Sequence, residues 1–130
     1  MTQYLISFDF HAMDHIPGED MPAVGKAAQA VVQEAANAGV FVFTGGLESE
    51  QASIVSTDGT VSDGPYPETK EVIGGLMVVE VPSRGDALEW AAKIAVACRC
   101  AQEVRVFQPG PDIGAMLREA DSRRQRPDDV

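Results

Sequence analysis

Residues Gln3–Phe10, with the sequence Gln-Tyr-Leu-Ile-Ser-Phe-Asp-Phe, alternate between two kinds of side chain. The even positions are apolar throughout, whereas the odd positions turn polar toward the end of the stretch. The odd positions are Leu5, Ser7, Asp9 and the following His11. A period of two residues predicts a β-strand, and two unlike faces indicate a sheet with a core on one side and a wetter space on the other.

The remaining patterns predict further strands and helices around this one. Strands are expected at Val40–Thr44, Val72–Val81 and Glu103–Gln108, and helices at Met21–Asn37, Arg84–Ala97 and Asp112–Ser122. Between them, Ala52–Ser56 and Thr60–Ser62 flank Asp58-Gly59, a strong hairpin signal. Gly74-Gly75 interrupts its strand and indicates a bulge or a close backbone approach.

The order β-α-β, hairpin, β-α-β predicts an α+β fold of the ferredoxin-like type, with both helices on one face of the sheet. The other face still carries apolar residues and needs cover. Pairing of two copies through that face would enclose a cavity and give a dimeric α+β barrel. A monomer with a wet sheet face is the competing interpretation. Residues 1–110 form the expected domain, followed in 111–130 by a short helix and a disordered tail.

Composition narrows the class of protein. A chain of 130 residues with 45% hydrophobic residues fits one globular domain. Its net charge of −10 disfavours nucleic-acid binding, because phosphate backbones are repelled. No apolar run reaches about 18 residues, and no secretory signal is visible, so neither a membrane span nor export is expected. We therefore expect a cytoplasmic protein.

The sequence offers no motif for a metal or a cofactor. Cys98 and Cys100 supply only two of the four ligands of a structural zinc site, and they are expected to be free, packed thiols. A metal site from His11, Asp14 and His15 is conceivable, but loop spacing is not diagnostic. Glycine-rich phosphate loops and serine nucleophile elbows are lacking. No metal and no cofactor are predicted.

The run Asp63-Gly-Pro-Tyr-Pro-Glu-Thr-Lys-Glu71 resembles the signature of the DGPF family, a branch of the YCII-like superfamily. Gly74-Gly75, Asp86–Ala91 and Glu103–Arg105 fit the same pattern, which covers about residues 1–108. The resemblance implies a dimeric α+β barrel, and some members resemble lyases or hydrolases that use a His–Asp pair. Their histidine lies in the first helix, where Met21–Asn37 has none, so the motif carries over only Asp63.

Asp63 and His11 are the predicted catalytic residues, with Asp63 as acid/base and His11 as its partner. Asp63 also fits an Asx-turn, and His11 an ordinary loop residue. The predicted substrate-binding residues are Ser7, Asp9, Tyr66, Lys70 and Arg105. Arg105 serves either as an anchor for an anion or in an ion pair with Asp9. Lys70 is either a second anchor or part of a solvated strand edge. Tyr66 either donates a hydrogen bond to the substrate or packs its ring.

Two functions from different classes remain open. The first is an acid/base enzyme without cofactor, a lyase, isomerase or hydrolase, that acts in a cavity between two copies of the chain. Its substrate would be a small aromatic, carbonyl-bearing or anionic molecule. The second is a non-catalytic module that binds a small ligand or a protein partner.

Overall fold

The computed structural model describes residues 1–48, 52–64, 72–109 and 113–124. Its main sheet contains β1 (Thr2–Asp9), β2 (Phe41–Gly46), β5 (Ile73–Val81) and β6 (Glu103–Val106) in the spatial order β2-β5-β1-β6. Every neighbouring pair is antiparallel. β1 therefore lies inside the sheet, between β5 and β6.

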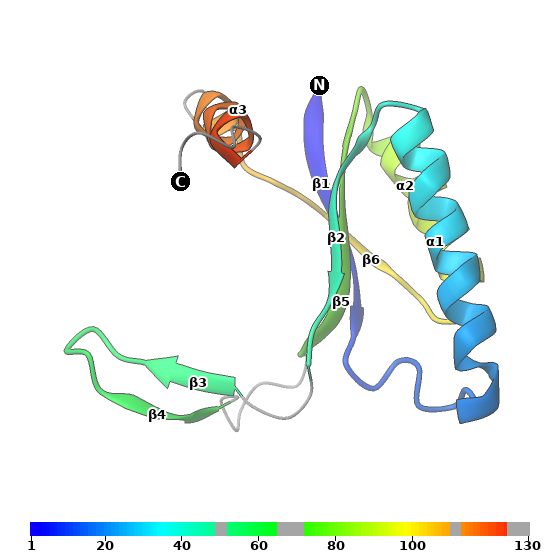
Figure 1. Cartoon of the computed structure of the whole chain (residues 1–130), viewed down its shortest axis with the longest axis horizontal. Helices are drawn as coiled ribbons and strands as arrows, with labels where there is room; N and C mark the ends of the chain where they lie inside the picture. Colours follow the sequence, from blue (N-terminus) through cyan, green and yellow to red (C-terminus); the bar gives the residue numbers. More distant parts are fainter. Residues whose placement is uncertain (49–51, 65–71, 110–112, 125–130) are drawn as a thin grey trace.

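Both long helices cover one face of this sheet. Helix α1 (Met21–Asn37), preceded by the 3-10 turn η1 (Gly18–Asp20), connects β1 to β2, and α2 (Arg84–Cys98) connects β5 to β6. Figure 1 shows α1 and α2 side by side on the same side of the strands. This is the ferredoxin-like α+β fold that the sequence predicts.

The alternation along β1 decides what the core contains. Tyr4 and Ile6 face the helices and are buried, at 7% and 1% exposure. They pack with alternate residues of β5 and with small residues of the helices. These partners are Met77, Val79, Val81, Ala35, Ala87, Ala91, Ile94 and Cys98. The apolar even face predicted for this strand is confirmed.

The predicted signals at two helix ends, Gly39 and Ser83, are confirmed. Gly39 follows α1 with φ of +76°, a conformation that only glycine adopts without strain. Ser83 begins α2, and its hydroxyl oxygen accepts the backbone N–H of Asp86. Arg99 ends that helix in the left-handed region, at φ of 57°.

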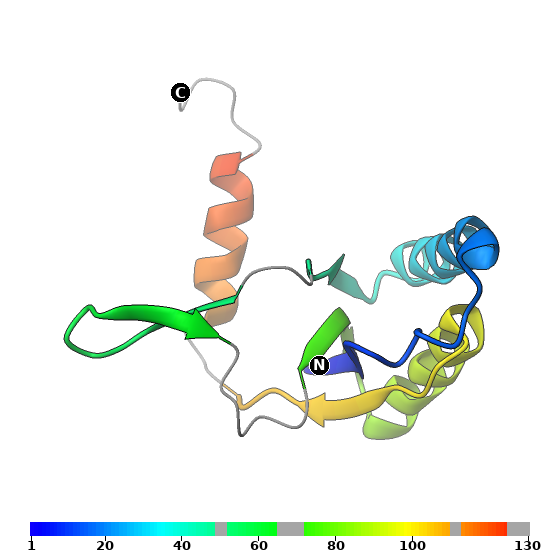
Figure 2. The ribbon, with the colours of Figure 1, turned by 90° about the horizontal axis from the view of Figure 1, so that it is seen from below.

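Two elements lie on the other side of the sheet. The hairpin of β3 (Ala52–Val55) and β4 (Val61–Gly64) and helix α3 (Ile113–Arg124) project away from the side that bears α1 and α2 (Figures 1 and 2). The hairpin turns at Asp58-Gly59, as predicted. There the backbone N–H of Thr60 donates to the Asp58 carboxylate and lowers the pKa of that carboxyl group.

The paired glycines mark the close approach that the sequence indicates. The register between β1 and β5 shifts after Phe8, so that Phe8 faces Gly75 and Asp9 faces Ile73. A side chain at Gly74 would place its Cβ 2.7 Å from the Cα of Phe10. The backbone N–H of Phe10 donates to the carbonyl of Val72. The bulge thus ends β1 at Asp9 and turns the chain.

The strand boundaries otherwise differ from the predicted ones by two residues or fewer, and α1 matches its prediction. The tail beyond residue 124 lies outside the described residues, and the domain boundary near residue 110 stays a prediction. No helix among the described residues is both long and apolar enough to cross a membrane.

We predict that Gly74→Ala destabilises the fold by about 1–3 kcal/mol, because the new methyl group meets backbone atoms that cannot rotate away. Urea unfolding followed by circular dichroism measures the change. Gly25→Ala is the control: that position in α1 is exposed with no atom near the new Cβ, so alanine should stabilise by about 0.5–1 kcal/mol. Equal stability of Gly74→Ala and wild type would contradict the close approach.

Candidate functional site

A pocket of about 320 Å³ lies where β1 ends beside β6 and the start of β5. It is lined by polar and apolar residues from three separate parts of the sequence. These residues are Ser7, Phe8, Asp9, Val72, Ile73, Ala101, Gln102, Glu103 and Arg105. Three of the predicted substrate-binding residues, Ser7, Asp9 and Arg105, therefore meet at one site.

Sheet register explains this convergence. Ser7 of β1 lies opposite Glu103 of β6, and Leu5 lies opposite Arg105. Residues facing each other in an antiparallel pair project to the same face, so all four lie on the side away from the helices. Ser7 is 4% exposed, which makes it a polar group at the buried base of the pocket.

Arg105 forms its ion pair within its own strand. Its Nε lies 3.8 Å from an Oε1 of Glu103, and the Arg105 side chain is 68% exposed. The predicted ion pair with Asp9 is wrong. Arg105 aligns with Leu5, four residues before Asp9 on β1, and that separation is about 13 Å along a strand. The guanidinium is therefore open toward the pocket and the solvent.

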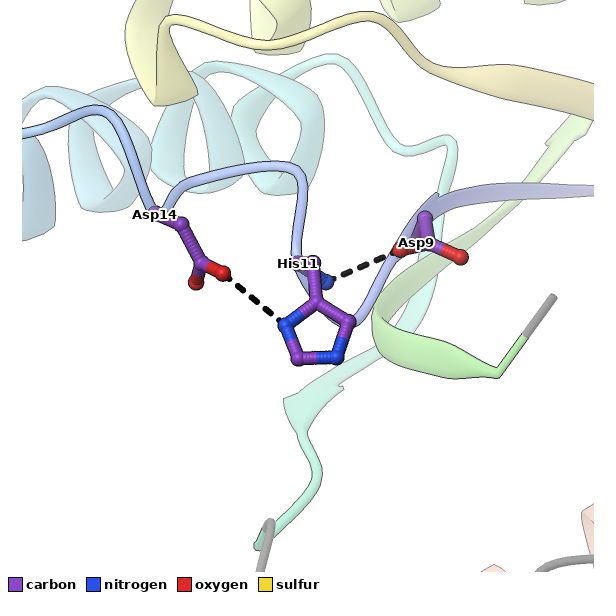
Figure 3. A network of polar contacts seen from close by, with 3 residues as sticks. All are labelled: Asp9, His11 and Asp14. Carbon is purple, nitrogen blue, oxygen red and sulfur yellow. Dashed lines mark hydrogen bonds and ion pairs between the residues drawn. The ribbon is translucent and has the colours of Figure 1, made fainter. Parts of the chain in front are cut away.

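His11 does not continue the polar face of β1, and that prediction is also wrong. The strand ends at Asp9, and the chain turns so that the backbone N–H of His11 donates to Oδ1 of Asp9 over 2.9 Å. Figure 3 shows the imidazole directed toward Asp14, away from the Asp9 carboxylate. The glycine bulge opposite Phe8 and Asp9 causes the turn that alternation alone could not reveal.

Asp14 is the partner of the imidazole. Its Oδ2 lies 2.9 Å from Nδ1 of His11, and the ring of Phe10 stands edge-on to the imidazole at 5.0 Å. Both members of this pair are largely solvent-exposed, at 74% and 68%. The sequence does contain a signal for this pair, because a carboxylate follows the histidine by three residues in a loop with two prolines nearby. Sequence reasoning weighed Asp14 only as a metal ligand.

The other predicted residues lie elsewhere. Asp63 is exposed in β4, opposite Ser53, and it does not line the pocket of its own chain. The hairpin that carries it projects beyond the sheet (Figure 1). Tyr66 and Lys70 lie outside the described residues. A single chain thus brings Ser7, Asp9 and Arg105 to one pocket without Asp63.

A second pocket, of about 220 Å³, lies under α1 on the helix side of the sheet. Its lining is mostly apolar, from Met13, Met21 and Val24 to Ile94 and Cys98. Sequence reasoning missed it, although glycines at 25, 45, 46 and 75 leave space along its walls. Phe8 and Gln102 line both pockets and separate them.

The two cysteines are free thiols, as predicted. Burial raises the pKa of the Cys98 thiol, and the nearby Cys100 adds to that rise. Burial also raises the pKa of Cys100, against a hydrogen bond from the Gln102 amide. Within the described parts of the chain, no three histidine, cysteine or acidic side chains gather as a metal site would require.

Comparison with known proteins places this geometry in a family. A family model described as the YCII-related domain matches residues 15–108. The chain belongs to the YCII-related family. This membership confirms the YCII-like resemblance read from the sequence.

The solved structures that are similar to this YCII-related chain include one enzyme. It is 5-chloro-2-hydroxyhydroquinone dehydrochlorinase (TftG) from Burkholderia phenoliruptrix AC1100, in complex with 2,5-dihydroxybenzoquinone. The TM-score is 0.47 at 13% sequence identity, over 83% of this chain and 95% of that chain. No curated protein matches the sequence.

We predict that Cys98 and Cys100 resist alkylation at neutral pH, because a raised pKa leaves less thiolate to react. With iodoacetamide at pH 8, each should react at least about tenfold more slowly in the folded protein than in urea, and the rate should rise as the pH passes 9. Mass spectrometry of timed samples gives both rates. Equal rates in the folded and unfolded protein would contradict the burial of these thiols.

Proposed function

We propose that this YCII-related protein is an acid/base enzyme that works with its own side chains on a small anionic molecule, bound where Ser7, Asp9 and Arg105 meet. One observation carries the proposal. The pocket with the Arg105 cation ends at Asp9, whose carboxylate accepts the backbone N–H of His11, a histidine oriented by Asp14. The loop that carries the imidazole therefore begins directly after Asp9, at the end of the pocket that Arg105 lines.

Arg105 is suited to hold the anionic group. Its ion pair with Glu103 is long, at 3.8 Å, so guanidinium N–H groups remain for a bidentate contact with a carboxylate. A protein of net charge −10 attracts an anion only where a local cation dominates. Val72 and Ile73 offer an apolar wall for the carbon skeleton of the ligand. These features favour a small organic acid.

His11 is suited to move the proton. When Nδ1–H of His11 donates a hydrogen bond to Asp14, the lone pair of Nε2 is left to take a proton from the substrate. The carboxylate of Asp14 then stabilises the imidazolium that forms, as the carboxylate does in a catalytic triad. Removal of a proton next to an electron-withdrawing group is the step shared by elimination and isomerisation, and removal from water is the first step of hydrolysis. Asp63 is the proposed second acid/base group.

We predict that a small organic acid raises the unfolding temperature of the protein through Arg105. The probes are a panel of aliphatic and aromatic monocarboxylates, with inorganic phosphate beside them. An acid at 100 times its dissociation constant stabilises the fold by about 2.7 kcal/mol. Arg105→Met should abolish that rise, whereas Arg84→Met, at the exposed start of α2, should retain it. A rise that survives Arg105→Met would remove Arg105 as the anchor.

We predict that the protein exchanges a C–H proton of the acids it binds with solvent deuterium. His11→Gln should slow this exchange by about 10²–10⁴, the usual contribution of a general base. His15→Gln is the matched control, an exposed histidine of the same loop, and should exchange at the wild-type rate. Proton NMR in D₂O follows the loss of the C–H signal.

The alternative function, a ligand-binding module without catalysis, is favoured by the exposure of His11 and Asp14. Acid/base residues at 74% and 68% exposure are solvated in the single chain. Binding that depends on Arg105, without deuterium exchange in any bound acid, would support this alternative and contradict the enzyme.

A further inference from the structure

The sheet presents an open face, on the side away from α1 and α2. The register brings Phe43, Val78, Leu5 and Arg105 side by side across all four strands. Three of them are apolar, and Phe43 is 59% exposed. Among the strand residues that the structure describes, Arg105 is the only basic one. The open face is thus an apolar row that ends in a cation.

The β3–β4 hairpin presents a face with matching chemistry. Val55 pairs with Val61, and Ser53 pairs with Asp63 two residues along, so all four project to the same side. Val55 and Val61 are 67% and 64% exposed. This hairpin face is therefore an apolar pair next to a carboxylate.

The hairpin lacks a partner in its own chain. β3 and β4 pack on each other, and no other described element packs extensively against them. A two-stranded hairpin is marginally stable in water unless it packs against something else. In both views the hairpin lies on the open side of the sheet and projects away from it (Figures 1 and 2). Its apolar face therefore calls for a surface that another molecule supplies.

We propose that the β3–β4 hairpin of each chain lies on the open sheet face of a second copy, where Asp63 pairs with Arg105 of the partner subunit. A two-fold dimer covers the hairpin face and the open sheet face of both chains at once, because each chain offers one hairpin and one open face. The inference rests on the pocket of the proposed function and adds Asp63 to it from the other chain.

The spacings of the two faces agree. Val61 and Asp63 lie about 6.6 Å apart along β4, and neighbouring strands of the open face are about 4.8 Å apart. When Val61 packs over Leu5 of the partner subunit, the Asp63 carboxylate therefore lies within reach of the long side chain of Arg105 of the partner subunit. The carboxylate needs this cation, since a buried and unpaired charge is costly.

The pairing gives the dimer a chemical role. Arg105 lines the pocket, so Asp63 of one chain enters the pocket of the other and faces the ligand together with Ser7 and Asp9. The acid/base set with Asp63 and His11 is complete only when two chains meet.

Disulfide trapping tests the contact directly. The variant carrying both Asp63→Cys and Arg105→Cys is oxidised mildly and run on a non-reducing gel, with wild type alongside to account for Cys98 and Cys100. We expect a covalent dimer. Asp58→Cys with Arg105→Cys is the matched control, because Asp58 lies in the turn about 16 Å farther along the hairpin, and it should stay monomeric.

A disulfide within one chain, identified by mass spectrometry of the monomer, would overturn the proposal, because the hairpin would then cover its own sheet. Absence of a cross-link with Asp63→Cys, or equal cross-linking with Asp58→Cys, would overturn it too. Failure here with Arg105-dependent acid binding retained would leave the proposed function standing. Trapping of the covalent dimer, together with no acid binding by the wild-type protein, would contradict the proposed function alone.

Sedimentation velocity over a concentration series tests the apolar part of the proposed contact between the hairpin and the open sheet face. Val61→Lys should weaken dimerisation by at least about tenfold, about 1.4 kcal/mol, because its charge enters the apolar contact. Ser62→Lys, on the opposite face of the same strand, should change it less than twofold. A monomeric wild type, or equal effects of the two lysines, would contradict the inference.

Discussion

The alternation of side chains on β1 is the constraint on which the rest of the molecule depends. This strand lies between β5 and β6, so its register fixes what faces the helices on both neighbours. Tyr4 and Ile6 enter the core because they share a face with Met77 and Val79. A slip by one residue would send Ser7 into the core and Ile6 into water.

The end of β1 matters as much as its register. Gly74 and Gly75 let β1 and β5 approach closely, and the register shift there ends the strand at Asp9. The chain then turns, and the Asp9 carboxylate accepts the backbone N–H of His11. The close approach at these two glycines thus fixes where the strand ends and where the loop with His11 begins.

Two apolar surfaces, the open sheet face and the face of the β3–β4 hairpin, stay exposed in the single chain. α1 and α2 satisfy one face of the sheet, whereas the other bears Phe43, Val78 and Leu5 next to Arg105. The hairpin with Val55, Val61 and Asp63 points to the same side. Apolar surface exposed on two elements of one small chain is costly in water, and association relieves both at once.

The sequence by itself determined the elements and their order. Period-two and helical patterns located the strands and helices, and Gly39, Ser83 and Asp58-Gly59 marked their ends, because each acts through neighbouring residues. It also placed Ser7 and Asp9 on one face of their strand, and Arg105 with Glu103 on one face of theirs, since strand faces follow from alternation.

Tertiary structure alone decided the orientation of His11, the role of Asp14, the partner of Arg105 and the pocket under α1. The orientation of His11 and its pairing with Asp14 depend on where β1 stops against β5, and the pocket depends on how α1 packs over β2 and β5. Alternation gives the face on which a residue lies, but register and bulges, which arise from contacts between distant segments, give its neighbours.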